Sequence, residues 1–441
     1  ATSPAPSRVR QHQLEFTHLV AAIGFGGNAV VLDPQLGARP RERVGTKHRR
    51  GITSEGQGGW RRLHVKCAST PGAPDETGDG SESTVRTLMI RRIAVNTGGG
   101  DAPGLNAVIR AVAISGMTRG WEVLGIRQGY RGLLDDPDGV VCLDRNSVRG
   151  IHHRGGTILG STNRGDPFNY PVMKGGELVP TDVSGKIIQR LEELGVDALV
   201  AIGGDGSIRL SAKLLERGLR RVIAVPKTID NDLAGTDLTF GFDTAVATAT
   251  DAIDKLHTTA QAHERVMVVE VMGRHAGWIA LYSGMAGGAD VVLIPEIPFD
   301  MERVCDKIRW REIMNRRFAI VVVAEGAMPA GGSAVFKEGA DKFKEHGQLG
   351  GIAEYVAREV HERTGKETRS IVLGHLQRGG SPVMTDRVLA LRLGCAATRF
   401  SAETTTSGLV AVRGSQIQFV PISEAIQRIR TGPRDSDVPT S

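Results

Sequence analysis

The sequence has 441 residues, of which 40 % are hydrophobic and 24 % charged, and its formal net charge is +6. These proportions are typical of a globular chain of two or three domains, and no apolar run is long enough to span a membrane. Residues 1–67 carry 11 basic and 4 acidic side chains, whereas the remaining residues carry 44 and 45, so the body of the chain gives no charge signal for nucleic acid.

The first 67 residues are rich in Arg, poor in acidic residues and low in periodic pattern. This composition is typical of an organelle transit peptide, and it ends in Val65–Ala68, which resembles a plastid processing site. We therefore expect residues 1–67 to be a plastid transit peptide, 68–87 to be a flexible linker and the protein to work in the plastid (chloroplast) stroma. If the leader is instead a disordered tail, the expected location is the cytoplasm. The widely spaced cysteines predict free thiols: Cys67, Cys142, Cys305 and Cys395.

Apolar runs and helical spacings alternate through the rest of the chain. The pattern predicts strands over 88–96, 121–126, 198–202, 221–225, 266–271, 291–294, 318–323, 367–373, 409–413 and 417–420. It predicts helices over 105–115, 186–194, 208–218, 244–259, 276–286, 301–314, 351–364, 385–397 and 422–430.

This alternation predicts an α/β fold with mainly parallel sheets and helices on both faces. We expect two Rossmann-like three-layer domains, with the active site in the cleft between them. The first domain should span 88–228 and the second 229–384, and the C-terminal segment 385–430 should pack back on the first.

Two glycine-rich turns, Gly98–Gly104 and Gly203–Ser207, follow predicted strands. Glycine lets the backbone approach a phosphate closely, and the helix that follows offers free N–H groups. Neither a Walker motif nor an ordered GxGxxG is present. Asp205 within the second turn would repel phosphate unless Mg²⁺ lies between them, which predicts a magnesium ligand; a plain Asx turn is the alternative.

Asp230 and Asp232 follow the strand at 221–225 and are two residues apart. On an extended segment such side chains point the same way. One of them can serve as the base that phosphoryl transfer to a hydroxyl requires, although solvent-facing loop acids would show the same spacing. Four arginines recur near strand ends and predict a phosphorylated substrate, with His375 beside the last: Arg265, Arg274, Arg369 and Arg378.

Several motifs give the chain a family resemblance. Residues 369–387 read RSIVLGHLQRGGSPVMTDR, and TGGGDAPG, GGDGS, PKTIDND and EVMGR precede them in that order. In these motifs the chain resembles ATP-dependent 6-phosphofructokinases, most closely the cyanobacterial type, over about residues 92–394. The resemblance implies direct in-line transfer from ATP to the 1-hydroxyl of fructose 6-phosphate, giving fructose 1,6-bisphosphate and ADP, the committed step of glycolysis.

The resemblance also implies roles for individual residues. Asp230 would take the proton of the 1-hydroxyl, with Thr228 and Asp232 beside it, and Arg274 would stabilise the moving phosphoryl group. ATP would bind at Gly99, Arg164, Gly203, Gly204, Asp205, Gly206 and Ser207, with Mg²⁺ on Asp205. Fructose 6-phosphate would bind at Thr228, Ile229, Asp230, Arg265, Met272, Gly273, Arg274, Glu325, Arg369, His375 and Arg378.

Two of these arginines, Arg265 and Arg369, would come from a neighbouring subunit, so the resemblance implies a homo-oligomer, a tetramer or a dimer. It implies no nucleic-acid or membrane partner. The allosteric site of bacterial relatives is only partly matched, so the resemblance does not by itself imply activation by ADP. Arg110, Arg145 and Arg316 fit that site, whereas Ile114, His257 and Met314 replace basic residues.

The phosphoryl donor depends on two positions. Gly206 leaves room for a nucleotide, whereas pyrophosphate users carry Asp there; Lys227, however, is typical of pyrophosphate users. The sequence favours ATP on the steric argument and leaves a pyrophosphate-dependent enzyme as the alternative. A non-catalytic regulatory subunit, or a lipid or NAD kinase that shares the GGDG turn, are further alternatives.

Overall fold

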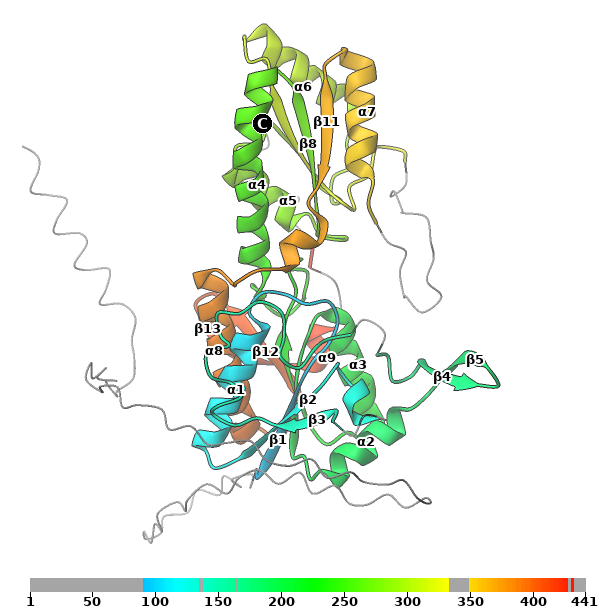
Figure 1. Ribbon diagram of the computed structural model, residues 1–441, viewed down its shortest axis with the longest axis vertical. Helices are drawn as coiled ribbons and strands as arrows, with labels where there is room; N and C mark the ends of the chain where they lie inside the picture. Colours follow the sequence, from blue (N-terminus) through cyan, green and yellow to red (C-terminus); the bar gives the residue numbers. More distant parts are fainter. Residues whose placement is uncertain are drawn as a thin grey trace, which may run out of the picture. The chain divides into compact units, whose positions relative to one another are not determined.

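The computed structural model describes residues 90–134, 136, 138–162, 165–332, 349–426 and 430–431. Over these residues the chain forms a seven-stranded sheet, a four-stranded sheet and a two-stranded hairpin (Figure 1). No helix in this part of the chain is long and apolar enough to cross a membrane. The expectations for residues 1–67, residues 68–87 and Arg164 fall outside the described residues.

The seven-stranded sheet has the order β13-β12-β7-β6-β1-β2-β3. Its inner strands pair in parallel, and the edge strands β3 and β13 are antiparallel to their neighbours. The central strands are continuous apolar runs because helices cover both of their faces. The strands are β1 (Arg92–Thr97), β2 (Glu122–Ile126), β3 (Val140–Cys142), β6 (Ala198–Gly203), β7 (Val222–Pro226), β12 (Gly408–Arg413) and β13 (Gln416–Pro421).

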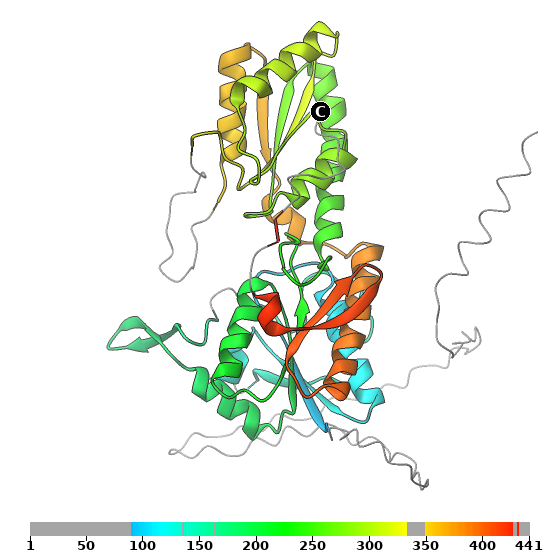
Figure 2. The same cartoon turned by 180° about the vertical axis from the view of Figure 1, so that it is seen from behind.

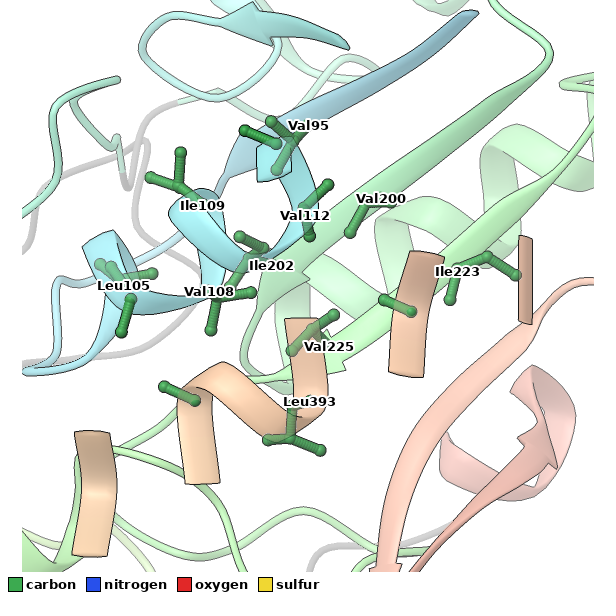
Figure 3. Close-up of a cluster of buried hydrophobic side chains, with 14 of the residues drawn as sticks. Val95, Leu105, Val108, Ile109, Val112, Val200, Ile202, Ile223, Val225 and Leu393 are labelled. Atoms are coloured by element: carbon green, nitrogen blue, oxygen red, sulfur yellow. The ribbon is translucent and has the colours of Figure 1, made fainter. Parts of the chain in front are cut away.

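Side chains alternate across this sheet and form a core on each face. On one face, Val200 and Ile223 pack with α1 (Leu105–Thr118) and α8 (Met384–Glu403), as Figure 3 shows. On the other face, α2 (Ser184–Glu193) and α3 (Asp205–Glu216) cover Leu199. The C-terminal part of the chain therefore completes the first sheet with α8, β12, β13 and the short α9 (Ile422–Ala425), which Figure 2 shows from behind.

The four-stranded sheet has the order β11-β8-β10-β9 and is parallel throughout. Val269 and Val322 face α4 and α5, whereas Val268 and Val321 face α6 and α7. Its elements are α4 (Phe242–His263), β8 (Val266–Val271), α5 (Trp278–Ala286), β9 (Val291–Leu293), α6 (Met301–Ile313), β10 (Ala319–Ala324), α7 (Ile352–Thr364) and β11 (Thr368–Val372).

The predicted α/β fold with mainly parallel sheets is confirmed, and most predicted elements differ from the observed ones only at their ends. Some short elements have no counterpart among the predicted strands and helices: the hairpin of β4 (Tyr170–Lys174) and β5 (Glu177–Thr181), the edge strand β3, and two 3₁₀ turns, η1 (Arg131–Leu133) and η2 (Gly374–Arg378). These elements are too short for a periodic pattern to identify.

Three other predictions are corrected. The helix after β6 begins at Asp205 rather than Ile208, because Gly204 already adopts the extended N-cap conformation. The predicted helix over 422–430 ends as α9 at Ala425. Cys142 is disulfide-bonded, whereas Cys305 and Cys395 are free, so the expectation of free thiols fails at Cys142.

Candidate functional site

The two glycine turns meet at Ser207, in the first turn of α3. A Cβ placed on Gly203 would lie 2.3 Å from the Ser207 Cβ, and one on Gly98 would lie 2.7 Å from its Oγ. The Gly98 N–H donates a hydrogen bond to the Ile202 carbonyl at 2.9 Å. Glycine is required for this approach at position 203, and both turns lie at the same edge of the first sheet because β1 and β6 are parallel neighbours.

A polar pocket of about 310 Å³ opens beside the first glycine turn. The Ser161 hydroxyl donates to the Gly99 carbonyl at 2.5 Å and joins the segment after residue 155 to that turn. Backbone and hydroxyl groups dominate this wall, which suits a phosphate group. The lining residues are Gly99, Gly100, Asp101, Gly156, Thr157, Ser161 and Thr162.

Asp205, the predicted magnesium ligand, is the first residue of α3 and is paired with Arg209. The Arg209 Nε lies 2.9 Å from both carboxylate oxygens. No group of three or more potential metal ligands occurs among the described residues. Mg²⁺ in phosphate sites typically uses one or two carboxylates and takes its other ligands from phosphate and water. Asp205 at a helix N-terminus beside the glycine turns fits that donor set.

The loop from Thr228 to Gly241 carries the candidate base. Asp230 is only 4 % exposed, and its Oδ1 atom has no hydrogen-bond partner among the described residues. Its backbone N–H donates to the Thr228 Oγ1 at 3.0 Å. A buried carboxylate oxygen without a partner is costly, and such atoms occur where a ligand or metal completes the site.

The expected extended geometry of Asp230 and Asp232 is wrong. Asn231 between them has a φ of 51°, which turns the backbone away from a strand. The two carboxylates nevertheless affect one another. Burial raises the pKa of Asp232 to about 7, and the negative charges of Asp230 and Asp205 add to this effect while Arg274 opposes it. The negative charges of Asp205 and Asp230 therefore both act on Asp232.

Lys227, just before this loop, is 3 % exposed and donates a hydrogen bond to the Gly100 carbonyl. Burial lowers its pKa to about 8, as does the positive charge of Arg378, while Asp230 and other acids oppose the shift. Lys227 thus joins the loop of the candidate base to the first glycine turn.

Arg274 and Glu325 lie at the carboxyl ends of β8 and β10 in the second sheet. Arg274 has a φ of 53°, and its backbone N–H donates to the Glu325 Oε1 at 3.1 Å. Burial raises the pKa of Glu325 to about 7, and the charge of Asp230 also raises it. Asp230 from one sheet and Glu325 from the other therefore share an electrostatic environment.

Arg378, in η2, joins the second sheet to the pocket. Its guanidinium donates to the Asp101 carbonyl at 3.1 Å and lies against Gly100. The adjacent Gln377 accepts a hydrogen bond from the Met272 N–H at 3.3 Å, which fixes η2 beside the segment that carries Gly273. His375 in the same turn is exposed. Ile229, by contrast, is fully buried in the core around the second sheet.

The expectation that the four arginines lie at equivalent strand ends is wrong. Arg265 precedes β8 and Arg369 is the second residue of β11, so both lie at the amino ends of parallel strands. Both pair with Glu367, at 3.0 Å and 2.7 Å. Arg274 and Arg378 follow the same strands at their carboxyl ends. A strand of six residues separates its two ends by roughly 20 Å, so these two arginines lie far from Arg265 and Arg369.

Sequence reasoning missed Arg209 and assigned no role to Asp386. The spacing of four residues between Asp205 and Arg209 would indicate the first contact only if the helix began at Asp205, whereas the sequence pattern starts it at Ile208. Asp386 lies in the longest motif, but its partners Gly241 and Thr244 are about 140 residues away in sequence, as their hydrogen bonds of 2.8 and 2.7 Å show. No local pattern indicates such a contact.

The fold and the grouping of glycine turns, buried acids and arginines define an α/β phosphotransferase. Residues 92–401 match the phosphofructokinase family, and the chain belongs to that family. The predictions of family, enzyme class and fold are confirmed.

The chain is about equally similar to relatives named for two different phosphoryl donors, ATP and pyrophosphate. It is 52 % identical over 343 residues to an ATP-dependent 6-phosphofructokinase of Chloroflexus aggregans, covering 77 % of this chain and 93 % of the relative. It is 51 % identical over 344 residues to a pyrophosphate–fructose 6-phosphate 1-phosphotransferase of Amycolatopsis methanolica, covering 78 % and 96 %. The crystal structure of Pichia pastoris phosphofructokinase in the T-state aligns with a TM-score of 0.65 and 31 % identity over 80 % of this chain and 36 % of that chain.

Proposed function

We propose that the chain transfers the terminal phosphoryl group of ATP to the 1-hydroxyl of fructose 6-phosphate. The observation that carries this proposal is the buried Asp230 carboxylate, whose Oδ1 lacks a partner among the described residues, on the loop that Lys227 joins to the glycine-turn pocket. A base in this position can take the hydroxyl proton while the phosphoryl group is held by the adjoining turn.

In this mechanism the chain supplies position and charge. Asp230 accepts the proton, Thr228 and Asp232 flank it, and Arg274 offsets the charge on the transferred phosphoryl group. Glycine turns hold the donor through their backbone N–H groups. Asp205, once released from its ion pair with Arg209, would hold Mg²⁺, which would supply positive charge beside the phosphates.

ATP is proposed as the donor on the geometry around Gly206. A Cβ added there would meet no atom within 4 Å, so the first turn of α3 presents open space at the donor site. Lys227, the residue that favours pyrophosphate, is already engaged with the Gly100 carbonyl. The relative in Amycolatopsis methanolica makes pyrophosphate the specific second candidate.

Parallel assays with ATP and with pyrophosphate at equal concentrations test the donor. Faster formation of fructose 1,6-bisphosphate with ATP is expected. Faster formation with pyrophosphate would overturn the argument from Gly206, and no product with either donor would overturn the proposed activity.

The sugar phosphate would contact residues of both sheets. Glu325, Met272 and Gly273 would contact the sugar, and His375 and Arg378 would hold its 6-phosphate. Arg265 and Arg369, at the opposite ends of the strands, would reach the site of a neighbouring subunit in a homo-oligomer.

Mixed oligomers of Asp230→Ser and Arg369→Ala subunits test this sharing of sites. They should regain activity that neither variant has alone, and the absence of any regain would contradict shared sites.

Import into plastids is proposed from the composition of residues 1–67, which carry 11 basic and 4 acidic side chains. Fusion of this segment to a fluorescent reporter should direct the reporter into chloroplasts. A cytoplasmic reporter would contradict the proposal and leave the cytoplasm as the location.

A further inference from the structure

Arg430, near the end of the chain, contacts the loop that carries the candidate base. Its backbone N–H donates to the Asp232 carbonyl at 2.7 Å. Its guanidinium donates to the carbonyl of Asp237 in the same loop. The residue therefore holds two points of the loop between Thr228 and Gly241, one of them two residues from Asp230.

The same guanidinium also contacts an aromatic side chain from the core of the second sheet. Its central carbon is 4.7 Å from the centre of the Trp278 ring. Trp278 is the first residue of α5, is 7 % exposed and belongs to the core of the second sheet. It follows Arg274 by four positions, so Arg430 lies between the segments that carry Asp230 and Arg274. A planar guanidinium can stack on an aromatic ring and donate hydrogen bonds at its edge at the same time.

Both of these segments contain a residue other than glycine in the left-handed backbone region. Asn231 and Arg274 have φ values of 51° and 53°, in the left-handed region that residues other than glycine rarely adopt. Such conformations persist only where surrounding contacts fix them. The bond from Arg430 to Asp232 is made at the residue next to Asn231. Its hydrogen-bond partners in the loop are carbonyl oxygens, which indicates a mechanical role in addition to the attraction between its charge and the Asp237 carboxylate.

We propose that Arg430 is a positioning residue that holds the Asp230 loop and the Arg274 segment in the arrangement required for phosphoryl transfer. The proposal rests on the function proposed above. Displacement of either segment by about 1 Å would misalign the base and the phosphoryl group, which lowers turnover by as much as about 100-fold. Substrate binding depends on many other contacts and should change little.

The test compares Arg430→Ala with Arg413→Ala as a matched control. Arg413 also lies against Asp237, at 3.9 Å from its carboxylate, and pairs with Glu424, whereas the cation over the Trp278 ring is that of Arg430. We expect Arg430→Ala to lower kcat about 10- to 100-fold with KM for both substrates within about twofold of the wild type. Arg413→Ala should keep the wild-type kcat.

Two further measurements separate positioning from loss of folding. Free guanidinium at low concentration should raise the kcat of Arg430→Ala but not that of the wild type. A variant that is merely destabilised would instead lose further activity. Arg430→Lys, which retains the cation over the ring but not the planar group, should have an intermediate kcat and an unchanged melting temperature.

An active wild type together with an unchanged kcat in Arg430→Ala would overturn the inference and leave the proposed function standing. A fall in kcat that guanidinium does not restore, with an equal fall in Arg413→Ala, would also overturn it. A wild type inactive with ATP would instead refute the function proposed for the site.

Discussion

At the scale of single residues, Asp230 has the environment that a base requires: it is 4 % exposed, and its Oδ1 atom has no hydrogen-bond partner among the described residues. We expect Asp230→Ser to lower kcat by about 10²- to 10⁴-fold, the usual contribution of a general base. Binding of fructose 6-phosphate, measured by calorimetry, should be retained because the other sugar contacts remain. Turnover equal to the wild type would remove Asp230 from the mechanism.

Glu325 gives a prediction about pH and stability. Burial raises its pKa from 4.5 to about 7 in the folded protein, so the folded state binds a proton that the unfolded state has released. Its contribution to the free energy of unfolding is therefore complete below about pH 4.5 and is lost as pH rises through about 7. Between about pH 4.5 and 7, the melting temperature should fall less in Glu325→Gln than in the wild type.

Some decline should remain in Glu325→Gln, because burial also raises the pKa of Asp232 to about 7. Glu362→Gln, which changes an exposed acid on α7, serves as the control and should follow the wild type. A steeper decline in Glu325→Gln would mean that the carboxylate is stabilised rather than penalised by its surroundings.

At the scale of elements, the turn between β6 and α3 depends on one of its glycines and tolerates change at another. A Cβ on Gly203 would lie 2.3 Å from the Ser207 Cβ, whereas one on Gly206 meets nothing within 4 Å. We expect Gly203→Ala to cost about 1–3 kcal/mol through overpacking. Gly206→Ala should be neutral or stabilise α3 by up to about 1 kcal/mol. Denaturant titrations of the two variants check the contrast, and equal losses would contradict it.

At the scale of the whole molecule, Asp386 joins helices of the two large sheets. Its carboxylate, on α8, accepts hydrogen bonds of 2.8, 2.7 and 2.6 Å from the Gly241 N–H, the Thr244 N–H and the Thr244 hydroxyl at the start of α4. Asp386→Ala would leave these buried donors unsatisfied, at a cost of about 1–3 kcal/mol for each. Its melting temperature should fall well below that of Asp243→Ala, which removes a neighbouring acid. Equal melting temperatures would refute this role.

The sequence by itself determined the local structure and the family. Apolar runs placed strands such as β8 at their observed positions, because burial on both faces of a parallel strand demands such a run. The order of the motifs identified the phosphofructokinase family, since those motifs keep the residue types that phosphate chemistry requires.

Only the tertiary structure decided which of these residues meet. The contacts of Arg378 with Asp101, of Asp386 with Thr244 and of Arg430 with Asp232 each join positions more than 100 residues apart. Strand direction likewise placed Arg265 at the end of β8 opposite Arg274. Periodicity reports which face of an element is buried, whereas the pairing of distant segments is fixed by the packing of two sheets and their helices, which no local pattern records.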